Sequence, residues 1–250
     1  MGRVTRLAAA LADRVGLALV AKWRLKRLEA AEHLRQLLRR YEVDVVVDVG
    51  ANEGQFRDFL RLHVGFEGWI ASFEPVPEAF AVLESRASRD HRWSVSPVAL
   101  GARSGTASFH VSAHSTLSSF YKPNFAESDH AARKRATVRE IEVDLDTLDR
   151  QLPALLGRLG VARPYLKIDT QGSDMDVIRG AERCLGDIVG LQFEGSVIPL
   201  YEGPPPFTHV LAHLNERGFA LSAMFAAAND ASLRLLELDC VMVRDPPASS

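Results

Sequence analysis

Residues 48–54, with the sequence DVGANEG, combine residue types that suit a nucleoside-binding turn. Gly50 and Gly54 have no side chain, so the backbone can approach a ligand closely at both positions. Twenty residues after Gly54, Glu74 offers a carboxylate that can accept hydrogen bonds from both hydroxyls of a ribose, as the acid of dinucleotide-binding folds does. The spacing therefore predicts a site for a cofactor that contains a nucleoside.

The composition of this turn favours one class of cofactor. A dinucleotide site is typically G-x-G-x-x-G, with a pyrophosphate at the helix N-terminus. This turn has only two glycines and carries Glu53, which opposes a phosphate but suits a cationic ligand without one. S-adenosylmethionine is such a ligand, so it is favoured over a nicotinamide dinucleotide. ATP is less favoured still, because the sequence contains no GxxxxGK[ST] motif.

Two carboxylates at the ends of later strands are candidates for proton transfer. Asp169 and Glu194 each follow or end an apolar β run, so we expect them at the edge of the sheet where ligands bind. Proton transfer by a positioned side chain contributes about 10²–10⁴-fold in rate. His110 and His114 are further candidates. Mg²⁺ held by the two carboxylates is an alternative, but no third ligand is evident and no metal site is predicted.

Each candidate also has a structural interpretation that the sequence leaves open. Asp169 could cap the next helix, and Glu194 could accept a supporting hydrogen bond. The two histidines could be ordinary loop residues. Lys167, within a predicted strand, could pair with an acid or lie near the substrate.

The elements that position these residues alternate between strand and helix. Alternation of this kind indicates an α/β fold with a Rossmann-like, mostly parallel sheet. The short link at 228–232 predicts that the last two strands form an antiparallel hairpin. The predicted strands are 43–49, 69–73, 93–98, 165–168, 188–193, 219–224 and 235–243. The predicted helices begin after residue 54, at Pro77, at Ser173 (spaced as a capping box with Asp176) and near residue 207.

Two irregular segments interrupt this alternation. Residues 112–137 lack a clear period, and loops of that length are usually functional or disordered. Within them, residues 115–121 (STLSSFY) are interpreted either as a lid over the bound substrate or as a plain loop. Residues 201–207 (YEGPPPF) predict a rigid wall beside the site.

The charge of the chain is unevenly distributed. Residues 1–40 carry ten Lys or Arg and three Asp or Glu, whereas the remainder carries twenty and twenty-nine, so a basic head precedes an acidic body. Apolar residues at every fourth position predict helices in the head. We therefore expect a basic helical N-terminal extension at 1–42 and a Rossmann-like domain at 43–250. For the head, contact with an anionic surface and formation of a homodimer stay open.

Bulk properties exclude several protein classes. The chain is 47% apolar and 25% charged, which excludes a disordered tail, a collagen-like repeat and a polytopic membrane protein. The longest apolar run of the head spans residues 15–21, far short of the ~20 residues that cross a bilayer. Cys184 and Cys240 form no CxxC pair and are expected to be buried and reduced. We expect a cytoplasmic protein, with peripheral membrane contact as the alternative, and no nucleic-acid partner.

Several motifs, in register along the chain, resemble the FkbM-type methyltransferases. The resemblance implies a class I, Rossmann-like enzyme that transfers a methyl group from S-adenosylmethionine to a hydroxyl and releases S-adenosylhomocysteine. It implies a small-molecule or glycan acceptor, such as a sugar, a glycoside or a secondary metabolite. The motifs are VVDVGANEGQF (46–56), FEPVPEAFAVL (73–83), ALG (99–101), LKIDTQGSDMDVIRGAE (166–182), LQFEGSVIPLYEG (191–203) and RGF (217–219).

The resemblance also implies roles for individual residues. The methionine half of the cofactor would contact the 48–54 turn. The ribose would contact Glu74, with Pro75 beside it, and the adenine would contact Ala99 and Leu100. The turn residues in this role are Asp48, Gly50, Ala51, Asn52 and Gly54. The catalytic candidates are Asp169, Glu194, Gln171 and His114.

The sequence departs from the family pattern beside the expected acceptor site. Gln171 stands where the family usually has an acid, and Ser173-Asp174 where it usually has His-Glu. A nicotinamide-dependent oxidoreductase would share the fold and the acid that binds the ribose. The sequence does not favour this alternative, because the turn has no third glycine and no catalytic Tyr–Lys pair is evident. The change at Gln171 keeps a non-catalytic nucleoside-binding module as another alternative.

Overall fold

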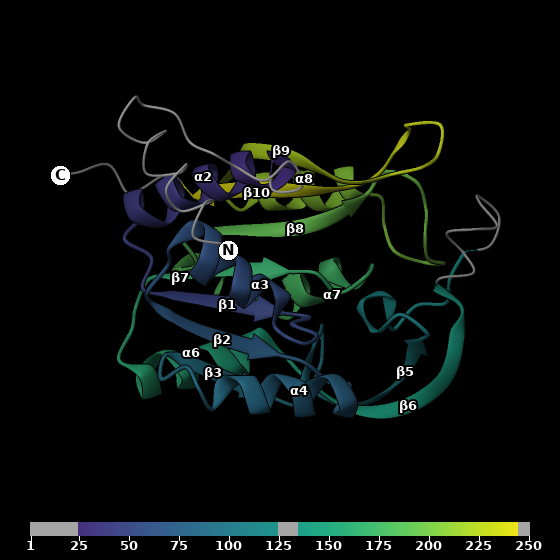
Figure 1. Cartoon of the computed structure of the whole chain (residues 1–250), viewed down its shortest axis with the longest axis horizontal. Coiled ribbons are helices and arrows are strands. Elements are labelled where there is room, and N and C mark those ends of the chain that lie inside the picture. The colour runs from purple at the N-terminus through teal and green to yellow at the C-terminus, as the bar shows by residue number, and fades with distance from the viewer. Residues whose placement is uncertain (1–24, 125–134, 245–250) are drawn as a thin grey trace, which may run out of the picture.

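The computed structural model of the protein describes residues 25–124 and 135–244. Most of the helix predicted in the basic head lies outside these residues. Seven strands form one sheet in the order β3-β2-β1-β7-β8-β10-β9 (Figure 1). The strands are β1 (Val45–Val49), β2 (Trp69–Phe73), β3 (Trp93–Ser96), β7 (Pro164–Ile168), β8 (Gly190–Ser196), β9 (Phe219–Asn229) and β10 (Leu235–Arg244).

The pairing confirms the predicted mostly parallel sheet and its closing hairpin. β1, β2, β3, β7 and β8 pair in parallel, whereas β10 runs antiparallel to both β8 and β9. All five residues of β1 are buried, because the sheet is covered on both faces, and such strands read as continuous apolar runs. The carboxyl ends of β1, β2, β7 and β8 meet at one edge, where ligands bind in this class of fold.

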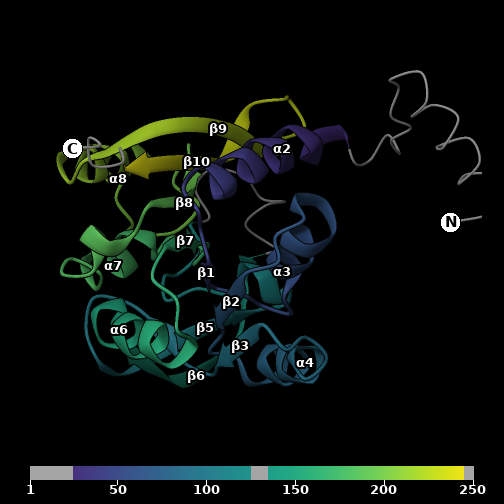
Figure 2. The ribbon, with the colours of Figure 1, turned by 90° about the vertical axis from the view of Figure 1, so that its left-hand side faces the viewer.

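Helices cover both faces of the sheet (Figure 2). One face packs against α6, α7 and α8, and the other against α2, α3 and α4, around two separate groups of buried apolar side chains. A π-helical turn, η2 (Leu60–Val64), directly continues α3. The helices are α2 (Leu25–Arg40), α3 (Gln55–Phe59), α4 (Pro77–Ala87), α6 (Leu148–Leu159), α7 (Asp174–Arg179) and α8 (Phe207–Glu216), with a short 3-10 turn, η4 (Leu185–Asp187), before β8.

α2 packs on the sheet rather than standing apart from it. Its residues Ala31, Leu34 and Leu38 are buried in the same group of side chains as Val46 of β1. The boundary between an extension and a domain at residue 42 stays a prediction. No helix within the two described ranges is long and apolar enough to cross a membrane.

A second, three-stranded sheet lies beside the main one, at the lower right of Figure 1. It pairs β4 (Ala99–Leu100), β6 (Thr137–Asp146) and β5 (Gly105–Ser112). It was not predicted, although apolar and polar residues alternate along β6 at Ile141, Val143 and Leu145 and along β5 at Phe109 and Val111, and these side chains pack together in a small core of their own. The interpretation of 112–137 as irregular is corrected at both ends: β5 reaches Ser112, η3 (Ser115–Leu117) is a 3-10 turn, and β6 begins at Thr137.

Candidate functional site

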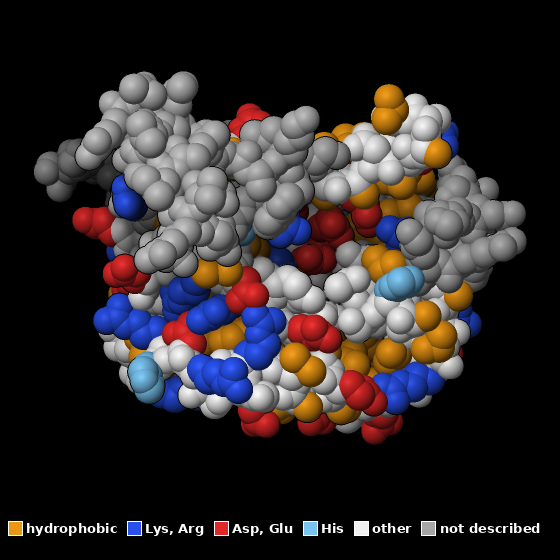
Figure 3. All heavy atoms as spheres, viewed as in Figure 1, with side chains coloured by type: hydrophobic (Ala, Val, Ile, Leu, Met, Phe, Trp, Pro, Cys, Tyr) orange, Lys and Arg blue, Asp and Glu red, His pale blue; other side chains and the backbone are white. Residues whose placement is uncertain are grey.

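A cavity of about 590 Å³ opens at the carboxyl ends of the parallel strands. Figure 3 shows a hollow near the middle of this face, with acidic side chains inside it and basic ones beside it. The lining comes from the β1, β2, β7 and β8 ends, from α2 and α3, and from β9 and β10. Cavities of this size hold drug-sized or cofactor-sized ligands.

The turn after β1 is built around a close approach of two backbones. Gly50 has a φ of 76°, and a Cβ added to it would lie 1.9 Å from the backbone oxygen of Asp169. The amides of Gly50 and Ala51 both donate to the carbonyl of Phe73, at 3.1 Å each. Only glycine fits at this position, so the tip of β1 is held against the tips of β2 and β7.

Glu74 reaches back from the end of β2 to this turn. Its carboxylate accepts hydrogen bonds from the amides of Asn52 at 2.7 Å and Val76 at 2.9 Å, and the residue is 5% exposed. Burial raises the pKa of Glu74 to about 6, although the two amides oppose that shift. Two bonds leave further lone pairs of a carboxylate free to accept from a ligand. Asn52 itself has a φ of 48° and lines the cavity with Glu74 and Pro75.

Asp48 lies beneath the site rather than in it. It is fully buried, accepts a hydrogen bond from Ser72 at 3.1 Å and lies 3.0 Å from the Lys167 ammonium. Lys167 also lies 3.5 Å from Asp169 and donates to the Gly50 carbonyl at 3.3 Å. Burial alone would lower the pKa of Lys167, but Asp48 and Asp169 raise it above its usual value. The pair thus ties β1 to β7 under the cavity.

Asp169 and Glu194 both line the cavity and share one hydrogen-bond donor. The Asp169 side chain is 40% exposed. The side-chain amide of Gln171 donates to Glu194 at 2.6 Å and to Asp169 at 3.3 Å. Burial, and next the charge of Asp169, raises the pKa of Glu194 well above its usual value. The three residues predicted as catalytic at these positions therefore lie together.

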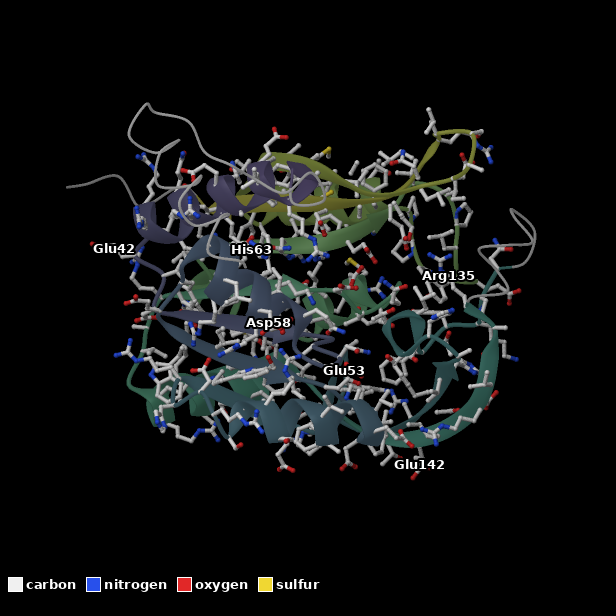
Figure 4. The ribbon with its side chains drawn as sticks, viewed as in Figure 1. Glu42, Glu53, Asp58, His63, Arg135 and Glu142 are labelled. Carbon is white, nitrogen blue, oxygen red and sulfur yellow. The ribbon has the colours of Figure 1, made fainter. Side chains whose placement is uncertain are left out.

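A third carboxylate joins this group from β10. Asp239 is the register partner of Glu194 and lines the same cavity. Burial, followed by the charge of Asp169, raises the pKa of Asp239 to about 6. Two residues along β10, Glu237 lies 3.1 Å from Arg135, which Figure 4 shows between the main sheet and the second sheet. Sequence reasoning missed Asp239, although an acid in an apolar strand is a signal.

The start of α7 differs from the predicted capping box. Ser173 is the N-cap, but its hydroxyl makes no hydrogen bond to the helix and is buried without a partner. Asp174 closes the turn instead, because it accepts from both the amide and the hydroxyl of Thr170, at 3.1 and 2.7 Å. Asp176 accepts from Tyr121 at 2.7 Å and so is not the reciprocal partner of Ser173. The capping-box prediction was therefore wrong.

The loop after β5 contributes part of the cavity wall. Ser115, Thr116, Ser118 and Phe120 line it. His114 is exposed and does not line the cavity. The other predicted histidine points elsewhere: His110 lies 3.3 Å from Glu140 of β6.

Most of the predicted cofactor residues line the cavity, and two do not. Asp48 and Gly54 are absent from the lining, and a Cβ on Gly54 would meet the Trp93 ring at 2.6 Å. Those that line it are Gly50, Ala51, Asn52, Glu74, Pro75, Ala99 and Leu100. Within the described ranges, no group of three His, Cys, Asp or Glu residues is arranged to hold a metal ion.

Further lining residues escaped sequence reasoning. Phe56 and Phe59 of α3 and Phe225 of β9 give the cavity an aromatic wall, and Gln192 of β8 adds a polar group. Arg27, Ala30 and Leu34 line it from α2. The apolar periodicity of the helices predicts that their side chains are buried, but it does not show which cavity they line.

Comparison with known proteins places the chain among methyltransferases. The family model described as the methyltransferase FkbM domain matches residues 48–221. A protein of Streptomyces tacrolimicus, named 31-O-demethyl-FK506 methyltransferase FkbM, is 30% identical over 158 residues, which are 56% of this chain and 60% of that protein. Methyltransferase 1 of Beauveria bassiana is 25% identical over 71% of this chain and 72% of its own.

A solved structure supports the fold. The FkbM methyltransferase of Methylobacillus flagellatus matches with a TM-score of 0.50 at 13% identity, over 80% of this chain and 44% of that chain. The chain thus spans less than two thirds of the Streptomyces and Methylobacillus proteins that it matches. Because the family model covers well over half of the residues, this chain belongs to the FkbM methyltransferase family.

Proposed function

We propose that the protein is an S-adenosylmethionine-dependent O-methyltransferase whose acceptor is a hydroxyl of a sugar, a glycoside or a secondary metabolite. The observation that carries the proposal is one cavity that joins a ribose-type acid, Glu74, to the strand-tip carboxylates Asp169 and Glu194. Membership of the FkbM family supports methyl transfer. The name of the Streptomyces relative, which refers to an O-demethylated substrate, supports oxygen as the methyl acceptor.

The residues present fit S-adenosylmethionine. The Gly50 turn leaves no room for a side chain, Glu74 offers a buried carboxylate to the two ribose hydroxyls, and the ring of Phe109 lines the cavity near Ala99 and Leu100. The carboxylates of this cavity suit a ligand that is cationic and has no phosphate. When bound, the cofactor supplies the methyl group and leaves as S-adenosylhomocysteine.

The chain's own residues would orient the acceptor and remove its proton. A hydroxyl is a poor nucleophile, so we assign the general base to Asp169, whose side chain is open to the cavity and is positioned from behind by Lys167 at 3.5 Å. Glu194 would accept a hydrogen bond from a second hydroxyl of the acceptor, or would share the proton that Asp169 removes. Alignment of acceptor and cofactor is the larger requirement, and the tips of β1, β2 and β7 would support it because backbone hydrogen bonds join them.

The acceptor end of the cavity suits a ring with several hydroxyls. Phe56, Phe59 and Phe225 give the cavity apolar surface, while Gln192 and Asp239 give it hydrogen-bond partners. Sugars and alicyclic rings have this pairing of an apolar face with a polar edge. His114 has no part in the proposal, because it does not face the cavity.

Binding and transfer assays test the proposal in two steps. Titration calorimetry with S-adenosylhomocysteine, NADH and ATP should show binding of the first alone, and tight NADH binding without a response to S-adenosylhomocysteine would refute the proposal. Methyl transfer from tritiated S-adenosylmethionine is then measured on methyl glycosides and on 31-O-demethyl-FK506. Repeating the assay with EDTA decides whether a divalent cation is needed.

A further inference from the structure

Gln171 occupies an unusual position directly after β7. Its backbone has a φ of 52°, a region that residues other than glycine seldom adopt, and it is only 8% exposed. The Ser119 hydroxyl donates to its carbonyl at 2.6 Å. The backbone is therefore held in a costly conformation that aims this side chain at the cavity.

The side-chain amide of Gln171 has one orientation that satisfies all its neighbours. Nε2 donates to Glu194 Oε2 at 2.6 Å and to Asp169 Oδ1 at 3.3 Å, which uses both of its hydrogens. Oε1 accepts from the Tyr201 hydroxyl at 2.8 Å. The reversed amide would place Oε1 against two carboxylates, which accept but cannot donate when ionised.

Tyr201 is itself anchored independently of the carboxylates. The residue is 4% exposed, the Arg135 guanidinium lies 5.8 Å from its ring centre, and its hydroxyl also lies 3.1 Å from the Leu117 carbonyl. Tyr201 further pairs with Pro123 in a single β-bridge. The orientation of the Gln171 amide is thus set by a hydroxyl that contacts neither Asp169 nor Glu194.

The amide matters because the surroundings of Glu194 are strongly acidic. Four further carboxylates face it. Lys167 pairs with Asp48 and Asp169, and Arg135 with Glu237, while Arg27 lines the same cavity and its charge acts on Asp239. Within the described residues Glu194 forms no ion pair, and the Gln171 amide is its hydrogen-bond donor. The facing carboxylates are Asp169, Asp174, Glu237 and Asp239.

We propose that Gln171 is a positioning residue, an amide clamp that holds Asp169 and Glu194 side by side and stabilises the ionised form of Glu194 relative to its protonated form. The role of this pair in proton removal rests on the function proposed above. The clamp itself is a property of the folded protein and is testable without an acceptor.

Titration of Glu194 tests the clamp directly. The protein is labelled with ¹³C at glutamate side-chain carboxyl carbons, and the Glu194 resonance is assigned by its absence from Glu194→Gln. Gln171→Met has a similar length but neither donates nor accepts, so the ionised carboxylate loses its donor. Loss of a hydrogen bond to a charged carboxylate should raise the titration midpoint of Glu194 by about one to two pH units. An unchanged midpoint would overturn the proposal.

A matched variant separates the clamp from a general loss of packing. Gln151 also donates to a carboxylate, Asp146, at 2.7 Å, but from α6 and outside the cavity. Gln151→Met should leave the Glu194 midpoint unchanged, and an equal shift in both variants would overturn the proposal.

A second change covers the case in which Gln171→Met does not fold. Tyr201→Phe removes the hydroxyl that orients the amide and leaves the amide in place. A smaller upward shift of the Glu194 midpoint is therefore expected, and the absence of any shift would overturn the clamp.

Once an acceptor is found, the acidic limb of the pH profile of turnover should move with the Glu194 midpoint. Binding of S-adenosylhomocysteine to the unaltered protein is measured alongside: its absence would refute the methyltransferase function while leaving the titration result intact.

Discussion

The two halves of the cavity, called the cofactor half and the acceptor half after their proposed ligands, are built in different ways. The cofactor half is a local structure: the Gly50 turn, Asn52 and Glu74 lie within one strand–helix–strand unit and are joined by hydrogen bonds that backbone amides donate. The acceptor half is assembled from β7, β8 and β10, where Asp169, Glu194 and Asp239 meet through strand register.

This difference has a chemical consequence. In the cofactor half, backbone amides satisfy a single buried acid, Glu74. In the acceptor half, carboxylates crowd one another and depend on the side chains of Lys167 and Gln171. We therefore expect the first half to fail by losing affinity and the second to fail by losing turnover.

The largest expected effect is in the acceptor half. Asp169→Asn keeps the size of the side chain but removes the base, so turnover should fall by about 10²–10⁴-fold. The Kd for S-adenosylhomocysteine should change less than about threefold, because a Coulombic contact half open to solvent contributes little. Single-turnover transfer and calorimetry measure the two quantities. Asp187→Asn, on the exposed turn η4, is the control, and full turnover in Asp169→Asn would refute the base assignment.

The next effect breaks the cofactor half. Glu74→Ala removes the acceptor for two ribose hydroxyls and leaves the amides of Asn52 and Val76 without their partner. Affinity for S-adenosylhomocysteine should fall about 100-fold or more. Glu53 was expected beside the ligand, but it is exposed and does not line the cavity. Glu53→Ala should therefore bind within about threefold of the unaltered protein. Near-normal binding by Glu74→Ala would show that the ribose lies elsewhere.

The same contrast explains how far the sequence could predict the molecule. The arrangement of the cofactor half could be predicted because its residues are spaced by the local geometry of one turn, and Gly50, Asn52 and Glu74 all line the cavity. Their contact with a cofactor stays a prediction. Asp48 was assigned to the lining, but its spacing could not show that Lys167 would reach it from β7 and hold it beneath the floor.

The acceptor half was only partly predictable. Asp169 and Glu194 stand out as acids at strand ends, yet Asp239 becomes their neighbour only through the antiparallel pairing of β10 with β8. Tyr201 lies thirty residues from Gln171 in the sequence and meets it only in the folded chain. The second sheet was missed for a different reason: apolar residues at 141, 143 and 145 alternate with acids, but this period-two pattern was not interpreted as a strand.

A stability measurement tests the junction between the halves. Gly50→Ala puts a Cβ 1.9 Å from the Asp169 carbonyl oxygen at a φ of 76°, so the free energy of unfolding should fall by about 2 kcal/mol or more. Gly157→Ala is the matched control: this glycine lies in α6 with open space around its Cβ position, and a gain of about 0.5–1 kcal/mol is expected. Urea unfolding measures both, and equal effects would contradict the close approach.

The smallest expected effect is a pH dependence of cofactor binding that belongs to the cofactor half alone. The pKa of Glu74 is raised to about 6 by burial, and ribose hydroxyls are bound best by its charged form. Below pH 6 the free protein must lose a proton from Glu74 to bind, so affinity for S-adenosylhomocysteine should fall up to about tenfold per pH unit and be constant above pH 7. Calorimetry between pH 5 and pH 8 measures this, with circular dichroism to verify folding. Glu74→Gln should remove the dependence, and Asp169→Asn should retain it, because its charge belongs to the other half. Loss of the dependence in Asp169→Asn would show that the two halves titrate as one unit.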